Sequence, residues 1–156
     1  MLRRAKLLCV DDDPGIREFY DALFGSHNYE VVSAANGRQA LTILRSHRNK
    51  IDAVISDHDM PGMTGPELAA QIKLRWPELP VIIVSGSQPV LEEAPHFVDA
   101  AMAKGAPIHE ILCHVGLLVG EREQPDPSVP LTRFIPLGSA LATAALGALL
   151  VDKLSH

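Results

Sequence analysis

Residues 53–66 read Ala-Val-Ile-Ser-Asp-His-Asp-Met-Pro-Gly-Met-Thr-Gly-Pro. The first three residues are apolar in succession, which is typical of a strand buried on both faces of a sheet. Asp57 and Asp59 follow at the point where this strand stops. Gly65 and Pro66 then mark the start of a helix, because proline is favoured in the first helical turn. The stretch therefore predicts a buried strand, a polar turn and a crossover helix.

Similar units lie on both sides of this stretch. Short apolar runs at 7–10, 31–32, 81–84 and 98–102 predict the other strands. Helical patterns begin after Asp13 and Asn36, whose side chains suit N-caps, and again at Pro107. Strands that alternate with helices favour parallel pairing and right-handed crossovers. Five such units between residue 5 and about residue 121 predict an α/β protein with a doubly wound five-stranded parallel sheet and helices on both faces.

Apolar residues at helical spacing predict which helix faces are buried. In the first helix these residues are Ile16, Phe19, Tyr20 and Leu23, and the last helix carries Ile108 in its first turn. Residues three and four apart lie on one side of a helix, so we expect each set to face the sheet.

Composition limits the class of protein. The 156 residues suit one domain with a remainder, and a hydrophobic content of 47% can fill a core. Nineteen acids against fourteen Lys and Arg residues give a net charge of -5, which argues against a nucleic-acid-binding surface. Cys9 and Cys113 lie among apolar residues, as buried thiols in a reducing cytosol do. Only four apolar residues follow the basic start, so we expect no signal peptide and a cytoplasmic location.

Polar residues follow four of the five expected strands, at the edge where doubly wound sheets bind ligands. These residues are Asp11, Asp12 and Asp13 after the first strand, Asp57 and Asp59 after the third, Ser85 after the fourth and Lys104 after the fifth. Clustered carboxylates repel each other unless a cation lies between them, and Mg²⁺ takes oxygen ligands of this kind. A lysine and a hydroxyl group beside that cation would suit a phosphoryl group.

Four segments in this order resemble the receiver domains of bacterial two-component response regulators, the single-domain chemotaxis regulators among them. The segments are 10–14, 56–65, 84–86 and 103–104. The pattern Asp-x-x-Met-Pro-Gly-Met-x-Gly at 57–65 is specific by itself. The resemblance covers about residues 5 to 120, and it implies a flavodoxin-like fold with strand order 2-1-3-4-5.

The resemblance also implies roles for the residues at the strand ends. Asp57 would be the phosphoacceptor, and Ser85 and Lys104 would contact the phosphoryl oxygens. Four residues would provide the ligands of Mg²⁺: Asp57, Asp12, Asp11 through a water molecule, and Asp59 through its backbone carbonyl.

On the same basis, Asp57 would receive phosphate from a sensor histidine kinase or a phosphotransfer protein. Hydrolysis would then reset a switch that changes contacts with a downstream protein, so the chain would not be an enzyme in the usual sense. Two alternatives stay open. One is a receiver-like docking module that works without phosphorylation. The other is an aspartyl-phosphate hydrolase, suggested by Asp57-x-Asp59, although such enzymes generally have Thr where this chain has Met60 and Pro61.

Three departures from the family's pattern affect the expected output surface. Gly105 follows Lys104 where the family usually has proline, and glycine still allows a tight turn. Ala101 stands where most receivers have the aromatic residue that turns inward on activation. The stretch between Ser85 and Lys104 is about one helical turn shorter than in typical relatives, which predicts a short, irregular fourth helix.

The composition changes after residue 123. We expect a receiver domain at 1–123, a proline-rich linker at 124–133 and a hydrophobic C-terminal tail at 134–156 that forms a helix. Residues 134–151 carry no charge, and their 18 residues reach the lower limit of a membrane span. Three roles for the tail stay open: an anchor in the inner membrane, a docking helix or a homodimerisation helix.

Overall fold

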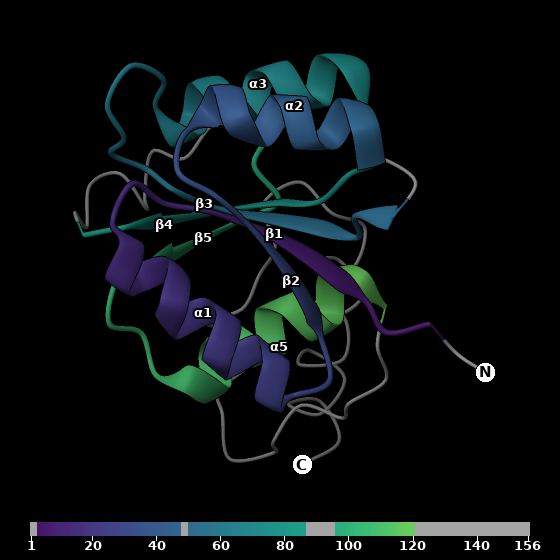
Figure 1. The fold of residues 1–156 in the computed structure, drawn as a ribbon, viewed down its shortest axis with the longest axis vertical. Coiled ribbons are helices and arrows are strands. Elements are labelled where there is room, and N and C mark those ends of the chain that lie inside the picture. The colour runs from purple at the N-terminus through teal and green to yellow at the C-terminus, as the bar shows by residue number, and fades with distance from the viewer. Residues whose placement is uncertain (1–2, 48–49, 87–95, 121–156) are drawn as a thin grey trace, which may run out of the picture.

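The computed structural model describes residues 3–47, 50–86 and 96–120. These residues form a five-stranded sheet in the order β2-β1-β3-β4-β5, in which every pairing is parallel (Figure 1). The strands are β1 (Lys6–Val10), β2 (Glu30–Ala34), β3 (Ala53–Asp57), β4 (Val81–Ser85) and β5 (Ala100–Ala103). The predicted doubly wound sheet and its strand order are confirmed.

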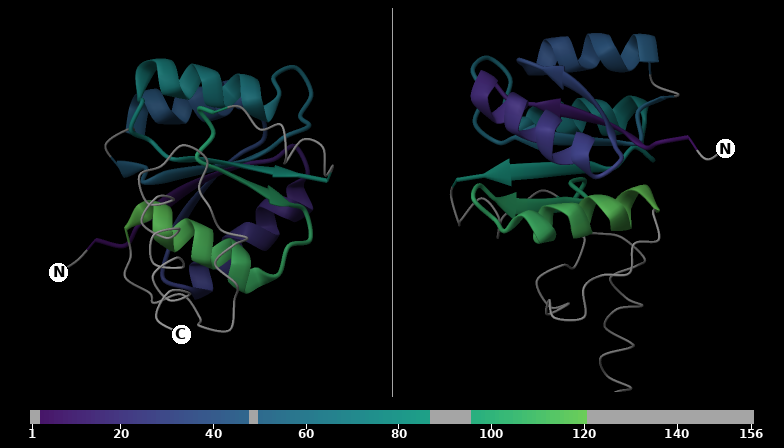
Figure 2. Two further views of the ribbon diagram at one scale, coloured as in Figure 1. Left: turned by 180° about the vertical axis from the view of Figure 1, so that it is seen from behind. Right: turned by 60° about the horizontal axis from the view of Figure 1, so that its bottom comes forward.

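Helices cover both faces of the sheet (Figures 1 and 2). They are α1 (Pro14–Ser26), α2 (Gly37–His47), α3 (Gly65–Arg75) and α5 (Ile108–Val119). Leu8 and Val10 of β1 pack with α2 and α3, whereas Leu7 and Cys9 pack with α1 and α5. Successive strand residues thus fill two separate cores, which explains the unbroken apolar runs in the sequence.

Several predicted features fall outside the described residues. The short fourth helix is expected between Ser85 and Lys104, a stretch in which residues 87–95 are not described, and the expected linker and C-terminal helix lie within 121–156. The last described element, α5, is closed by Gly120, whose φ of 74° is the left-handed conformation typical of a helix C-cap. Across the ranges that the structure describes, no helix is long and apolar enough to cross a membrane.

The helix starts follow local capping rules. The Asp13 carboxylate accepts a hydrogen bond from the backbone of Gly15 at 2.7 Å, and the Asn36 side chain accepts one from Gln39 at 2.9 Å. Both predicted N-caps are therefore confirmed. At α3, Thr64 forms a capping box with Glu67 and so begins the helix that was predicted to start at Gly65.

Burial differs from the prediction at several positions. Phe19 is 44% exposed, and Phe24 is the fully buried aromatic residue of α1. Phe19 lies at the flank of an apolar stripe centred on Tyr20 and Leu23, so it reaches past the edge of the core. Ile108, in the first turn of α5, is 47% exposed. Helical spacing thus identified the side of α1 and of α5 that faces the sheet, but not how many residues on that side are buried.

Two smaller expectations also need correction. The fifth strand begins at Ala100, two residues later than predicted, and the register with β4 begins at the pair Ile82 and Ala100. Cys9 is buried as expected, whereas Cys113 is only partly buried. Cys113 is not among the buried residues of α5, which are Ile111, His114, Val115 and Gly116.

Asp99 joins three segments at the amino-terminal edge of the sheet. Its Oδ2 accepts hydrogen bonds from the backbone of Val81 at 2.7 Å and from Lys73 Nζ at 2.6 Å. Lys73 Nζ also donates to the carbonyl of Leu79 at 2.7 Å. Asp99→Ala leaves the Val81 amide and the partly buried ammonium group without this acceptor. We expect a loss of about 2 kcal/mol in the free energy of unfolding, measured by urea denaturation.

Glu78→Ala serves as the matched control, because Glu78 is exposed and belongs to the same edge of the molecule. Its free energy of unfolding should stay within about 0.5 kcal/mol of the wild-type value. Equal stability of the two variants would contradict a structural role for the Asp99 contacts.

Candidate functional site

An acidic cluster lies at the carboxyl ends of β1 and β3. Val10 pairs with Ser56 in the register of these neighbouring strands, so the residues that follow them emerge side by side. One carboxylate oxygen from each of Asp11, Asp12 and Asp57 lies within 4.8 Å of the others. Asp11 and Asp57 are buried, with 2% and 3% exposed surface, and Asp12 is exposed.

Burial and mutual repulsion act on these acids. Burial raises the pKa of Asp11, and the negative charge of Asp57 raises it further. The hydrogen bond from the Asp13 backbone and the charge of Lys104 act in the opposite direction, but the net pKa stays above the usual value. Several carboxylates held this closely favour a cation at the same place.

Lys104 reaches the cluster from the end of β5. Its Nζ lies 3.0 Å from Oδ1 of Asp57, an ion pair that lacks the alignment of a hydrogen bond. Burial lowers the pKa of Lys104, but contact with Asp57 and the charges of Asp11 and Asp12 outweigh burial and raise it. The lysine therefore stays charged beside the buried carboxylate.

The turn after Lys104 does not need proline. Gly105 has a φ of 83°, in the left-handed region that favours glycine, and all peptide bonds of the described residues are trans. The backbone of Lys104 donates to the carbonyl of Ser85 at 2.8 Å. Gly105 thus forms the tight turn that was expected of it.

Ser85 and Asp59 occupy different positions relative to Asp57. Ser85 is buried at the end of β4, one residue beyond Val84, the residue that pairs with Asp57. The Asp59 side chain is 75% exposed, and its Oδ1 lies 2.8 Å from Nδ1 of His58. Its carboxylate is not part of the acidic cluster. The structure thus brings Asp11, Asp12, Asp57 and Lys104 together and directs the Asp59 carboxylate to solvent.

Two further residues at this site make contacts that no sequence pattern indicates. Arg17 of α1 donates from Nη1 to the backbone carbonyl of Asp11 at 2.6 Å. Gly65 packs directly against the backbone carbonyl of Asp57, and its amide donates to the His58 carbonyl at 2.8 Å. The Gly65-Pro66 pair indicated a helix start. Nothing in the sequence indicated that Arg17 or Gly65 contacts the site.

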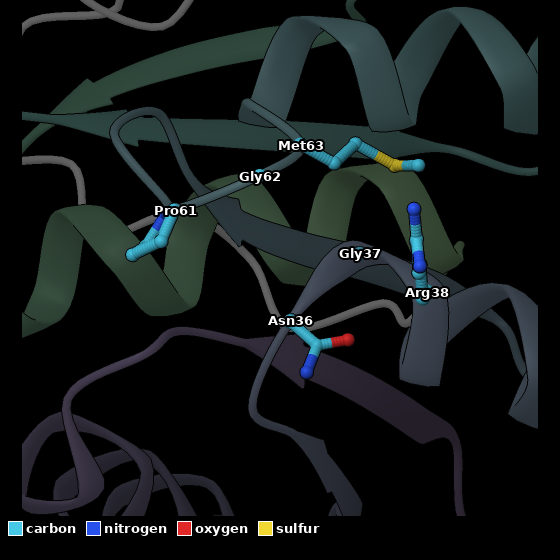
Figure 3. A pocket seen from close by; sticks show the side chains of 6 residues that line it. All are labelled: Asn36, Gly37, Arg38, Pro61, Gly62 and Met63. Carbon is cyan, nitrogen blue, oxygen red and sulfur yellow. The ribbon is translucent and has the colours of Figure 1, made fainter.

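A cavity of about 220 Å³ lies beside the β3–α3 loop rather than over the acidic cluster. Its walls are Asn36, Gly37, Arg38, Pro61, Gly62 and Met63. The Arg38 and Met63 side chains point toward each other from α2 and from the loop (Figure 3). The volume is below the roughly 300–1,000 Å³ of most small-molecule sites. None of the residues that line this cavity belongs to the acidic cluster.

Fold and site together define a class of protein: a flavodoxin-like α/β domain with an acid cluster and a lysine at the carboxyl edge of its parallel sheet. Residues 7–105 match the response regulator receiver domain family, and the chain belongs to that family.

Relatives of known sequence are larger regulators. The chain is 44% identical over 81 residues to the transcriptional regulatory protein GlrR of Escherichia coli, an alignment that covers 52% of this chain and 18% of that protein. It is 30% identical over 124 residues to the response regulator MprA of Mycolicibacterium vanbaalenii, covering 78% of this chain and 52% of that protein. The chain thus matches only part of each of these relatives.

Solved structures of similar chains have the same fold. The response regulator TrrA of Thermotoga maritima, determined in complex with Mg²⁺ and BeF, superimposes with a TM-score of 0.69 at 29% identity. This comparison covers 73% of our chain and 98% of that one. The chemotaxis response regulator CheY4 of Vibrio cholerae gives a TM-score of 0.68 at 26% identity, covering 74% and 99%.

Proposed function

We propose that this chain is a phosphoacceptor in two-component signal transduction and that Asp57 carries the phosphoryl group. One observation supports this most directly: the Asp57 carboxylate is buried between two further acids and the ammonium group of Lys104. A buried carboxylate next to a fixed cation is suited to attack phosphorus and to hold the product against water.

The residues divide the transfer step among them. An oxygen of Asp57 attacks the phosphorus of a phosphohistidine, the P–O bond forms, and the P–N bond breaks. The electron pair of the P–N bond stays on the imidazole nitrogen of the phosphodonor, and that nitrogen then takes a proton from water. Lys104 neutralises charge on the transferred oxygens, and the Ser85 hydroxyl donates a hydrogen bond to one of them. Attack of water on phosphorus then breaks the P–O bond to Asp57, releases inorganic phosphate and restores the carboxylate.

The acidic cluster fits Mg²⁺. The atoms that could bind the ion are all carboxylate oxygens, and two of the three carboxylates are buried. Oδ1 of Asp57 has no aligned hydrogen-bond donor among the described residues. Asp11, Asp12 and Asp57 would hold the ion, together with the Asp59 carbonyl. When bound, Mg²⁺ neutralises part of the negative charge that builds up on the phosphoryl oxygens.

The partners follow from this chemistry. The donor is a sensor histidine kinase or a histidine phosphotransfer protein, since the P–N bond of a phosphorylated imidazole breaks readily when a carboxylate attacks the phosphorus. The receiver of the signal is a downstream protein. The net charge of -5 gives no support to direct nucleic-acid binding by this chain.

Metal removal tests the proposal. The full chain is incubated with acetyl phosphate in Mg²⁺ or in excess EDTA, and the intact mass is measured. We expect one added phosphoryl group in Mg²⁺, labile to hydroxylamine as acyl phosphates are, and none in EDTA, because the clustered acids repel an incoming phosphate without the ion.

The other readings predict different results. Absence of any adduct in Mg²⁺ would point to a docking module that works without phosphorylation. Steady release of phosphate from unrelated phosphomonoesters would point to a hydrolase. The outward direction of the Asp59 carboxylate gives the hydrolase no support, because that group is not placed above Asp57 as a general acid.

A further inference from the structure

Arg17 links helix α1 to the acidic cluster. It lies in the first turns of α1, and its Nη1 donates to the backbone carbonyl oxygen of Asp11 at 2.6 Å in a partly buried position. A hydrogen bond with a charged donor at this distance is among the stronger polar contacts in proteins. The contact spans the turn that carries Asp12 and Asp13.

Asp11 is held at three points by three different segments. Its backbone amide donates to the Ala34 carbonyl of β2 at 3.2 Å. Its Oδ1 accepts from the backbone of Asp13 at 2.9 Å, and its carbonyl oxygen accepts from Arg17. These contacts set the rotation of the Asp11 peptide. They also set the direction in which Asp12, the next residue, leaves the strand.

Arg17 can act by its charge or by its hydrogen bond, and the two predict opposite results. A cation beside the cluster competes with Mg²⁺, so its loss through charge alone would tighten metal binding. Arg17 contacts the backbone carbonyl of Asp11 and not its carboxylate, and this contact closes the turn that carries Asp12. The geometry therefore favours an action through the hydrogen bond, which fixes the direction of the neighbouring carboxylates.

We propose that Arg17 is a positioning residue that aims the Asp11 and Asp12 carboxylates at the metal site next to Asp57. This inference rests on the proposed function only in placing Mg²⁺ at the cluster. Loss of a group that orients metal ligands typically weakens metal affinity by roughly 10- to 100-fold. Because one of three contacts to Asp11 is removed, we expect the lower end of that range.

Isothermal titration of the full chain with MgCl2, without any phosphodonor, tests the assignment. Arg17→Gln should bind Mg²⁺ about 10-fold more weakly than the wild type. Arg17→Lys keeps a donor but loses the planar fork, so its affinity should fall between the two. Arg45→Gln removes the same charge from the exposed last turn of α2 and should bind like the wild type.

Equal or tighter binding by Arg17→Gln overturns the assignment. Urea unfolding in EDTA shows whether each variant is folded. If Arg17→Gln is unfolded, Arg17→Lys decides, and wild-type affinity in that variant overturns the assignment. Acetyl phosphate labelling on the same samples separates the two proposals: a wild type that binds Mg²⁺ but takes up no phosphoryl group contradicts the proposed function alone. A wild type that binds no Mg²⁺ overturns both.

Discussion

Asp57→Asn protein is expected to take up no phosphoryl group from acetyl phosphate in Mg²⁺. The amide is close in shape to the carboxylate, so it fits the same buried position, where only 3% of the residue is exposed. The amide has no negative charge and no nucleophilic oxygen, and attack on phosphorus requires both. It also removes the anionic partner of Lys104, 3.0 Å away. Intact mass after a fixed incubation measures the loss, which should be complete.

Asp59→Asn is the matched control for this experiment. It makes the same chemical change two residues later, on a side chain that is 75% exposed and points to solvent. Its phosphoryl uptake should remain close to that of the wild type, because the proposal assigns the metal contact of this residue to its backbone carbonyl. Two results would contradict the choice of Asp57 as phosphoacceptor. One is phosphoryl uptake by Asp57→Asn at the wild-type level, and the other is a loss of phosphoryl uptake in Asp59→Asn alone.

Gly65→Ala is expected to destabilise the protein and to disturb the site at the same time. A Cβ atom at this position would overlap the backbone carbonyl of Asp57, and it would also crowd the Cα of His58 at 3.1 Å. These are backbone atoms next to buried strand β3, so they cannot rotate away as a flexible side chain can. We expect a loss of about 3 kcal/mol in the free energy of unfolding, measured with urea.

Gly25→Ala provides the control within the same chain. Gly25 lies in α1, and a Cβ atom there would meet nothing within 4 Å. Alanine favours the helix over glycine, so this variant should gain about 0.5 kcal/mol. If Gly65→Ala unfolds at the same urea concentration as Gly25→Ala, the close packing of α3 against Asp57 does not contribute to stability.

Much of the fold could be predicted because its signals are local. Asp13 and Asn36 cap helices through hydrogen bonds to residues two and three positions away. Strands β1, β3 and β4 could be recognised because each of them contributes side chains to both cores. Parallel pairing then followed from the alternation of strands and helices. None of these predictions depends on which residues, distant in the sequence, are in contact in the folded protein.

Burial at the margins could not be predicted in this way. Phe19 and Ile108 fit the helical spacing, yet both are more than a third exposed. Whether such a residue is covered depends on how far the neighbouring helix and sheet extend, and no pattern within α1 or α5 contains that information. Likewise, Lys73 and Asp99 lie 26 residues apart, and nothing in either segment marks them as partners.

The sequence by itself determined that acids and a lysine gather at one edge of a parallel sheet, because strand ends of the same polarity share that edge. Only the tertiary structure decided how they are oriented there. It buries Asp57 against Lys104, turns the Asp59 carboxylate outward beside His58, and bonds Arg17 to the carbonyl of Asp11. Those orientations depend on turn geometry and on packing between segments. Every residue has a backbone carbonyl oxygen, so the sequence does not indicate which of these oxygens accepts a hydrogen bond from Arg17.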